Sequence, residues 1–454
     1  MRKRVILAFL LAIALVATSS CSLIVKDEEV DKQTTIIEVA GKAITKAEVN
    51  EQIEAVLDYQ EYVYYLYGMS FDRTSDSSIS AARSSAIDNL IQDAVLSQKT
   101  AEMGLDELTG DELSEIEQSV DSTWDTYTSS IKSAYFADTE LAGDELDKAI
   151  EDKLAELGYP SKDELLTSQK TVKAREKLRS ETVKDVAVTQ EELESAYSSR
   201  VSEAMTNYGN TPSAYGTDVQ NGSTVYYVPA GYRFVKNILI KFTDEDNTAI
   251  NDLQSQITSK NSELATAESS LSDLGEDASA DDESASQNRA ALTETKDRLT
   301  GEIADLQAKL DSAKEAAYAA IQPTVDEVLT KLAEGGDFDA LMEQYGQDTG
   351  MQASPAKENG YPVSADSTNW VSEFRDAAMA LDKVGDVSAA VRSSYGIHIL
   401  KYVSDAVEGE VGLDSVKDAL ESELLANKQE EAYTAAVDQW VSDANAKVYE
   451  DRMN

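Results

Sequence analysis

The feature that most restricts the fold is a heptad-like pattern between residues 243 and 321. Apolar residues recur at steps of three, four or seven over 250–274, with Lys260 as an interruption, and again over 292–317. The acidic, small-residue stretch GEDASADDESAS separates the two runs. Steps of three and four keep apolar side chains on one helix face, so the pattern predicts two antiparallel helices forming a coiled-coil arm about 40 Å long.

Two roles for this arm are consistent with the sequence. The arm could grip a partner, or it could be an insertion that is tolerated at a surface loop. The heptads favour neither role over the other.

The first residues have the pattern of a secretory signal peptide over residues 1–20. Three basic residues, Arg2, Lys3 and Arg4, precede the apolar run 5–16, which is too short for a comfortable membrane span. Small residues then lead to Cys21. We therefore exclude this segment from the fold.

Cys21 is the only cysteine, so no internal disulfide is expected. Its position directly after ATSS resembles a bacterial lipobox, although Thr18 stands where leucine is commoner. We predict that the thiol of Cys21 is acylated; the alternative is an ordinary signal peptide with an incidental cysteine. Residues 21–35 are polar and charged enough to form a flexible tether.

No later run is long and apolar enough to span a bilayer. The predicted localisation is therefore extracytoplasmic, with the protein attached to a bacterial cell membrane through its lipid.

The chain is strongly acidic, with a formal net charge of −45. Removal of the signal peptide removes three basic and no acidic residues, so −45 minus three gives −48 for the remainder. Such a surface repels nucleic acid, which is not expected as a partner. It would favour cationic or unfolded basic clients, or it would simply confer solubility.

The 42% hydrophobic content allows real cores, and the 454-residue length suggests two to four domains. Amphipathic helix patterns predominate over 36–205, where Thr45 with Glu48 and Thr189 with Glu192 have capping-box spacing. Residues 206–232 are rich in Gly, Asn, Tyr and Ser and are predicted to be a linker loop.

The third region, 233–403, mixes strands and helices. Arg233–Phe242 has a strand pattern, two short helices flank Gly335-Gly336, and a further helix is expected in VSEFRDAAMALDKVG. DVSAAVRS and GIHILKYV follow as paired strands, the second of which contains His398, the only histidine. The pattern of apolar residues over 409–450 predicts one long amphipathic helix. The predicted fold class is α+β: mainly helical, with a small antiparallel-sheet domain.

Most familiar sites are missing from the sequence. One histidine and one cysteine exclude zinc-finger and His-rich metal sites, and no G-x-S-x-G elbow, phosphate-binding glycine loop or EF-hand spacing is present. We expect neither a metal nor a cofactor.

Four stretches together resemble a parvulin-type peptidyl-prolyl isomerase domain: RFVKNILIKF, LAEGGDFDALMEQYGQD, VSEFRDAAMALDKVGDVS and VRSSYGIHILKYV. The resemblance covers 233–242 and 323–403, with the arm inserted between the first strand and the first helix. The N-terminal helices and the C-terminal helix resemble the chaperone module of PrsA-type foldase lipoproteins and SurA-like proteins, which implies that the terminal helix packs back on the N-terminal ones.

The resemblance also implies roles for individual residues. His398 matches the second core histidine, Asp348 the Cys-or-Asp position, and Ser393 a hydroxyl position beside the histidine pair. The proline-binding cup would be formed by Phe374, Trp370 and Met379. The simpler alternatives are a core histidine, a solvated carboxylate, and core packing for the two aromatic residues.

Two departures from the family pattern bear on the catalytic rate. The family's first histidine is Asn237, which can still hydrogen-bond to His398 but cannot act as an imidazole. The family's Gly-Gly-Asp-Leu-Gly loop is replaced by KENGYPVS, which keeps Gly360 but brings Tyr361 and Pro362 to the rim of the cup.

The resemblance implies a lipid-anchored foldase that isomerises X-Pro bonds in unfolded or partly folded secreted polypeptides. Two alternatives remain at this point. The first is a holdase of the same architecture that has lost turnover through Asn237. The second is a coiled-coil scaffold or adhesion lipoprotein whose globular parts serve as supports.

Overall fold

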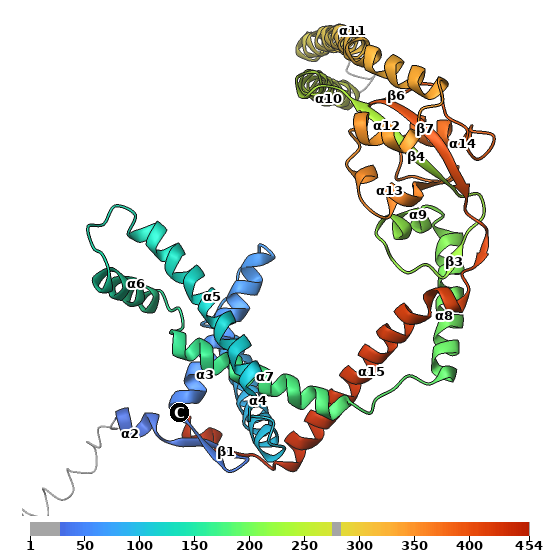
Figure 1. Ribbon diagram of the computed structural model, residues 1–454. Coiled ribbons are helices and arrows are strands. Elements are labelled where there is room, and N and C mark those ends of the chain that lie inside the picture. The colour runs from blue at the N-terminus through green and yellow to red at the C-terminus, as the bar shows by residue number, and fades with distance from the viewer. Residues whose placement is uncertain (1–27, 275–282, 454) are drawn as a thin grey trace, which may run out of the picture. The chain divides into compact units, whose positions relative to one another are not determined.

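A computed structural model describes residues 28–274 and 283–453 (Figure 1). The predicted signal peptide, Cys21 and the tether up to residue 27 lie outside these ranges, as does most of the predicted acidic tip of the arm. The chain forms two compact units, one up to Val188 together with Leu424–Asn454, and the other Thr189–Glu423. No helix within the described ranges combines the length and apolar character that a bilayer crossing requires.

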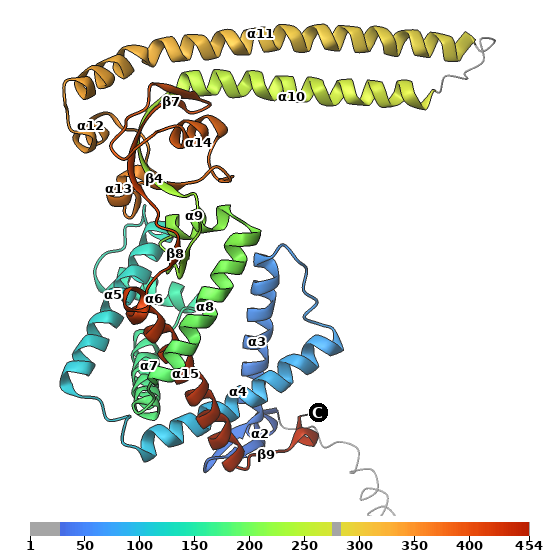
Figure 2. The same cartoon turned by 90° about the vertical axis from the view of Figure 1, so that its right-hand side faces the viewer.

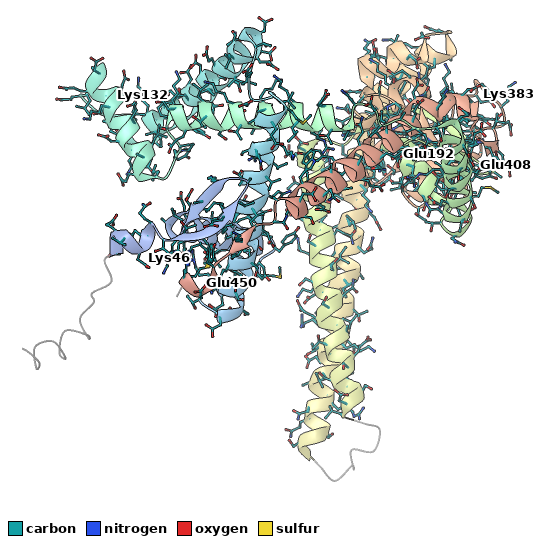
Figure 3. The ribbon with its side chains drawn as sticks, turned by 90° about the horizontal axis from the view of Figure 1, so that it is seen from below. Lys46, Lys132, Glu192, Lys383, Glu408 and Glu450 are labelled. Atoms are coloured by element: carbon teal, nitrogen blue, oxygen red, sulfur yellow. The ribbon has the colours of Figure 1, made fainter. Side chains whose placement is uncertain are left out.

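The first unit begins with a small antiparallel sheet in the order β2-β1-β9. Its central strand buries Ile36 and Ile37 completely. Lys46, labelled in Figure 3, forms an ion pair of 3.0 Å with Asp31 of the preceding short helix, so the end of the predicted tether is ordered. The elements are α2 (Glu28–Lys32), β1 (Thr35–Val39), β2 (Lys42–Thr45), β9 (Lys447–Val448) and η3 (Glu450–Arg452).

Five helices follow this sheet in the first unit. Capping boxes begin three of them, at Thr45, Thr109 and Ser161, because each of these residues is followed three positions later by a glutamate. The helices are α3 (Lys46–Leu66), α4 (Asp76–Glu102), α5 (Gly110–Tyr135), α6 (Asp144–Glu156) and α7 (Lys162–Val183).

The last long helix, α15 (Leu413–Asp443), reaches the first unit with its C-terminal part. Val437 packs there with Leu96 of α4 and Leu178 of α7 in one buried cluster. The strand β9 then pairs with β1. Contacts between the C-terminal segment and the N-terminal helices therefore help to close this core.

The second unit opens with a segment that differs from the predicted linker loop at 206–232. It contains the end of α8 (Gln190–Asn210), α9 (Ser213–Gln220) and β3 (Tyr227–Val228), which pairs with β8 (Gly409–Glu410). Tyr215 stacks edge-on against Tyr208 and Tyr232, with centroids 5.7 and 4.6 Å away. Buried tyrosines thus order a stretch whose glycine and asparagine content is typical of loops. Helix α8 also belongs to this unit, so the first unit ends before the predicted boundary at 205.

A four-stranded antiparallel sheet forms the centre of the second unit, in the order β5-β4-β7-β6. The pairing of β4 with β7 places Asn237 opposite Leu400 and Leu239 opposite His398. Since alternate residues of a strand share a face, Asn237, Leu239 and His398 lie on the same face of the sheet. The strands are β4 (Arg233–Lys241), β5 (Tyr361–Val363), β6 (Val391–Ser393) and β7 (Gly396–Asp405).

Helices pack against this sheet and enclose one hydrophobic core. Val235, Ile238 and Ile399 of the strands are fully buried in it, together with Val325 and Val328 of the long helix. The helices are the C-terminal part of α11 (Glu283–Ala333), α12 (Phe338–Tyr345), η2 (Gly350–Gln352), α13 (Ala356–Asn359) and α14 (Ser372–Met379).

The arm consists of α10 (Asp244–Asp273) and the N-terminal part of α11, which run antiparallel (Figure 2). The ion pairs Lys260–Glu302 (3.3 Å) and Lys296–Glu268 (3.0 Å) fix its register. The arm was expected to end at 321, but α11 continues through Pro323 to Ala333. The φ angle of proline suits a helix, and burial of Val325 and Val328 compensates for the missing N–H.

Candidate active site

A cavity of about 300 Å³ lies over the face of the sheet that carries Asn237, Leu239 and His398. Such a volume is at the small end of ligand-binding pockets. Strands β4 and β7 supply its floor, and α14 with the segment before it supplies one wall. The lining residues are Asn237, Leu239, Lys241, Asp348, Tyr361, Asn369, Trp370, Val371, Phe374, Tyr395 and His398.

The wall of the cavity is aromatic. Phe374 of α14 lies four residues after Trp370, which precedes the helix, and their ring centroids are 5.1 Å apart. The ring centroids of Tyr361, on β5, and Trp370 are 4.5 Å apart. The indole N–H of Trp370 donates to the Pro362 carbonyl at 3.1 Å. Phe374 meets the imidazole of His398 edge-on at 5.3 Å. One apolar wall and one polar floor therefore meet at the Phe374–His398 contact.

The floor is a chain of hydrogen bonds that begins at Ser393. The Ser393 Oγ lies 2.7 Å from the His398 Nε2, and the His398 Nδ1 lies 3.1 Å from the Asn237 Oδ1. The Asn237 amide donates from Nδ2 to the Asp348 Oδ2 at 2.8 Å, and the Tyr361 hydroxyl donates to the Asp348 Oδ1 at 3.0 Å. Five side chains are thus joined in one network.

The network specifies the protonation of His398. Because the Asn237 amide donates to Asp348, its Oδ1 is the atom that faces the imidazole and needs a proton on Nδ1. The Ser393 Oγ accepts the Tyr395 N–H at 3.1 Å, so its own hydrogen is available for Nε2. Burial lowers the pKa of His398 to about 4, so the imidazole is neutral at neutral pH.

This lowered pKa predicts an acid-dependent loss of stability. Between pH 6.5 and about 4 the unfolded chain binds a proton at His398 that the folded chain does not, so the free energy of unfolding falls as the pH falls. The expected loss is about 2 to 3 kcal/mol at pH 4.5. Urea unfolding at pH 7 and 4.5 measures it, and His398→Gln should remove this part of the difference. Equal losses in both proteins would contradict the assignment.

Two glycines leave room for close contacts beside the site. A Cβ at Gly350 would lie 2.3 Å from the Tyr361 hydroxyl oxygen. Glycine at this position therefore leaves room for the hydroxyl to reach Asp348. Gly360 has a φ of +86°, and a Cβ there would lie 2.8 Å from the Val235 carbonyl. Both glycines therefore permit the short path that brings Asp348 and Tyr361 together.

The structure brings most of the residues singled out from the sequence to one place. His398, Asp348, Asn237, Phe374 and Trp370 all line the cavity. The side chain of Ser393 is not exposed in the cavity but bonds to His398 from behind.

The prediction that Met379 helps to form the cup is wrong, because Met379 does not line the cavity. It follows Phe374 by five residues, which is about 140° around a helix, so the two side chains diverge. Met379 packs against the hydrophobic core instead.

Sequence reasoning assigned Tyr361 to the rim and missed its bond to Asp348. Burial and this carboxylate raise the pKa of the phenol, so it remains a donor. The other lining residues that were missed are Leu239, Lys241, Asn369, Val371 and Tyr395. The only available signal was their position inside the stretches that resemble the family or, for Asn369, two residues before one of them. Within 28–274 and 283–453, no group of three His, Cys, Asp or Glu side chains is arranged to hold a metal ion.

Comparison with known proteins adds a decisive match at this point. Residues 304–404 match the family model of the PPIC-type PPIase domain, and residues 1–132 match that of the SurA-like N-terminal domain. The chain carries a PPIC-type PPIase domain. The matched segment starts inside the arm, so β4 lies outside it. The structure nevertheless places β4 in the middle of the PPIase sheet, between β5 and β7.

The chain is also similar, over 25–28% of its length, to proteins named as PrsA foldases. It is 34% identical over 117 residues to the foldase protein PrsA of Clostridium botulinum (25% of this chain, 33% of that protein). It is 37% identical over 128 residues to the foldase protein PrsA of Geobacillus kaustophilus (28% and 43%). The chain thus spans less than half the length of these relatives. A solved structure of PrsA from Streptococcus pneumoniae aligns over 92% of this chain and 97% of that one, with 16% identity and a TM-score of 0.22.

Proposed function

We propose that the PPIase domain catalyses cis–trans isomerisation of X-Pro bonds in unfolded or partly folded polypeptides. The observation that carries this proposal is the contact between Phe374 and His398, where an apolar wall meets a hydrogen-bonded polar floor in one small cavity. A pyrrolidine ring fits the wall, and the peptide bond before it then lies over the floor.

The reaction requires rotation about a bond with partial double-bond character. Its barrier is about 18–20 kcal/mol, and no covalent bond breaks. A catalyst must therefore bind the twisted amide more strongly than the planar one. The aromatic residues Phe374, Trp370 and Tyr361 hold the ring while the preceding residue rotates.

The polar floor contributes an electrostatic effect. In a planar amide the carbonyl oxygen carries extra negative charge through resonance, and twisting returns part of that charge to nitrogen. The Asp348 carboxylate lines the cavity, and a carbonyl oxygen placed near it is destabilised most in the planar state. His398 and Asn237 hold this carboxylate in place, so their role is positioning and polarity rather than proton transfer.

For the whole chain we propose an extracytoplasmic foldase anchored through a lipid on Cys21. Support comes from the similarity to proteins named PrsA foldases and from the predicted signal peptide with its lipobox-like end. The clients would be secreted polypeptides that expose X-Pro bonds before they fold.

A surface in the first unit supports the chaperone part of this proposal. The four most exposed tyrosines at the C-terminal end of α3 and its cap, which we call the α3 tyrosine surface, are Tyr59, Tyr62, Tyr65 and Tyr67. Tyr65 and Tyr67 are 77% and 75% exposed. Nearby, Arg73 is shared by Glu54, Asp58 and Glu61, which leaves an acidic border. Exposed aromatic residues edged by carboxylates suit apolar, basic segments of an unfolded chain.

Removal of the α3 tyrosine surface should impair prevention of aggregation. The variant Tyr59→Ser/Tyr62→Ser/Tyr65→Ser is expected to raise several-fold the concentration needed to suppress light scattering by a reduced, unfolding client. Its tetrapeptide isomerase rate should be unchanged because the cavity is in the other unit. Tyr135→Ser, at a half-exposed tyrosine of α5, is the matched control. Equal suppression by the triple variant and the control would contradict this assignment.

A shortened arm tests the scaffold alternative. The ion pairs place residue 257 opposite residue 306, so replacement of 258–305 by a short turn keeps the root intact. A foldase should retain most of its suppression of client aggregation after this change. Loss of partner binding with unchanged isomerase and chaperone activity would favour the scaffold.

The holdase alternative rests on Asn237. A protease-coupled assay with a proline tetrapeptide tests it, because the proposal predicts slow but measurable isomerisation that Asn237→His raises. If the rate is at background and neither Asn237→His nor His398→Ala changes it, the holdase account replaces the enzyme.

A further inference from the structure

The root of the arm is bonded to the segment that carries Ser393. Tyr318 lies on α11, and its hydroxyl donates to the Ser393 backbone carbonyl at 2.9 Å. The Tyr318 ring also packs edge-on against Phe242, with centroids 5.0 Å apart. Phe242 directly follows β4 and Ser393 ends β6, and both of these strand ends lie beside Gly396 at the start of β7, so the same tyrosine touches two strand ends at one end of the sheet.

A charged pair secures this contact from the other side. The Arg392 guanidinium lies over the Tyr318 ring at 4.4 Å and makes two bonds to the Glu315 carboxylate, of 2.9 and 3.0 Å. Glu315 and Tyr318 are three residues apart on one helix face. Helix α11 therefore holds both Arg392 and Ser393 at the end of β6.

Ser393 receives contacts from two directions. Its carbonyl is held by Tyr318, and its side-chain oxygen meets the His398 Nε2 at 2.7 Å. Only 1% of Ser393 is exposed, so water does not replace either partner. The same oxygen accepts the N–H of Tyr395, which lines the cavity. A small rotation of this residue would shift the histidine, the cavity rim and the arm together.

We propose that Tyr318 is a positioning residue through which the arm root sets the orientation of the Ser393 hydroxyl on His398. It does not touch the substrate. Its effect on turnover rests on the proposed isomerase function, whereas its effect on the imidazole does not. A partner that displaces the arm root would change the isomerase rate through this contact.

Tyr318→Phe isolates the hydroxyl. The ring keeps its contacts with Phe242 and Arg392, so only the bond to the Ser393 carbonyl is lost. We expect kcat/KM to fall about fivefold, which corresponds to about 1 kcal/mol for one neutral hydrogen bond. KM should change little, because the aromatic wall is untouched.

The single histidine supplies a readout that is independent of activity. The full chain labelled with ¹⁵N only at histidine gives signals from one imidazole, and these report the tautomer and the bond at Nε2. We expect Tyr318→Phe to shift the Nε2 signal. Tyr345→Phe is the control, because the Tyr345 hydroxyl bonds Glu327 of the same helix at 2.6 Å away from the cavity.

The outcomes separate the two claims. A shifted Nε2 signal with a reduced rate supports the proposal, and an unchanged spectrum in the folded variant overturns it. A shifted spectrum with a normal rate overturns the effect on turnover. If the unmodified chain has no isomerase activity, the proposed function fails, while the spectrum still decides whether Tyr318 positions the imidazole.

Discussion

Replacement of Phe374 by alanine is expected to lower kcat/KM for a proline tetrapeptide about thirtyfold or more. Phe374 forms the wall that meets His398, and loss of contact with a phenyl-sized group is worth about 2 kcal/mol, or a factor of about thirty. The loss should appear largely in KM, because the ring binds proline in both the planar and the twisted state. The milder Phe374→Leu should retain part of the activity, since it keeps apolar volume but no ring.

A change in folding must be separated from a change in the cavity. Phe374→Ala removes a buried ring and should destabilise the domain by about 3–5 kcal/mol. Phe338→Ala is the matched control: Phe338 is equally buried in the same core but does not line the cavity. Both variants should lose similar stability, but only Phe374→Ala should lose binding. Equal activity in the two folded variants would remove Phe374 from the site.

The second large effect is expected from His398→Ala. This change leaves the Ser393 hydroxyl and the Asn237 Oδ1 without their shared partner inside the protein. Asn237 is then free to rotate away from Asp348, and the floor of the cavity loses its fixed charge pattern. We expect kcat to fall about a hundredfold or more, as when a preorganised hydrogen-bonding group is lost, and the free energy of unfolding to fall by about 2–4 kcal/mol.

Ser367→Ala serves as the control for His398→Ala. Ser367 is fully buried and bonds to Ser364 within the same unit, but it does not line the cavity. Its loss should lower stability and leave kcat unchanged. The rates are compared at a temperature where melting curves show that both variants are folded. A His398→Ala protein that turns over like the Ser367→Ala protein would mean that the imidazole is a structural core residue.

Several parts of the structure follow from short-range rules. The capping boxes at Thr45 and Thr189 begin helices as predicted, because the side-chain bonds involved span only three residues. The heptads of the arm likewise depend on local spacing. The placement of Asn237 opposite the β7 strand follows from strand alternation once the two strands are paired.

Other features depend on contacts between distant segments and could not be read from local pattern. Tyr361 bonds Asp348 because Gly350 leaves room for the tyrosine hydroxyl and Gly360 lets the chain pass close to the Val235 backbone, and nothing near Tyr361 in the sequence indicates this. The tyrosine cluster at 206–232 is ordered by packing, although its composition is that of a loop. Tyr318 belongs by pattern to the arm, yet it contacts the residue next to the histidine.

The most direct test of the central claim is two-dimensional exchange NMR on an Xaa-Pro peptide with a catalytic amount of the chain. Cis and trans signals of the peptide interconvert too slowly to give exchange peaks without a catalyst. Occupation of the cavity between Phe374 and His398 predicts exchange peaks with the unmodified chain, a large reduction with Phe374→Ala, and retention with Phe338→Ala. A spectrum without exchange peaks in the presence of the folded, unmodified chain would contradict the account.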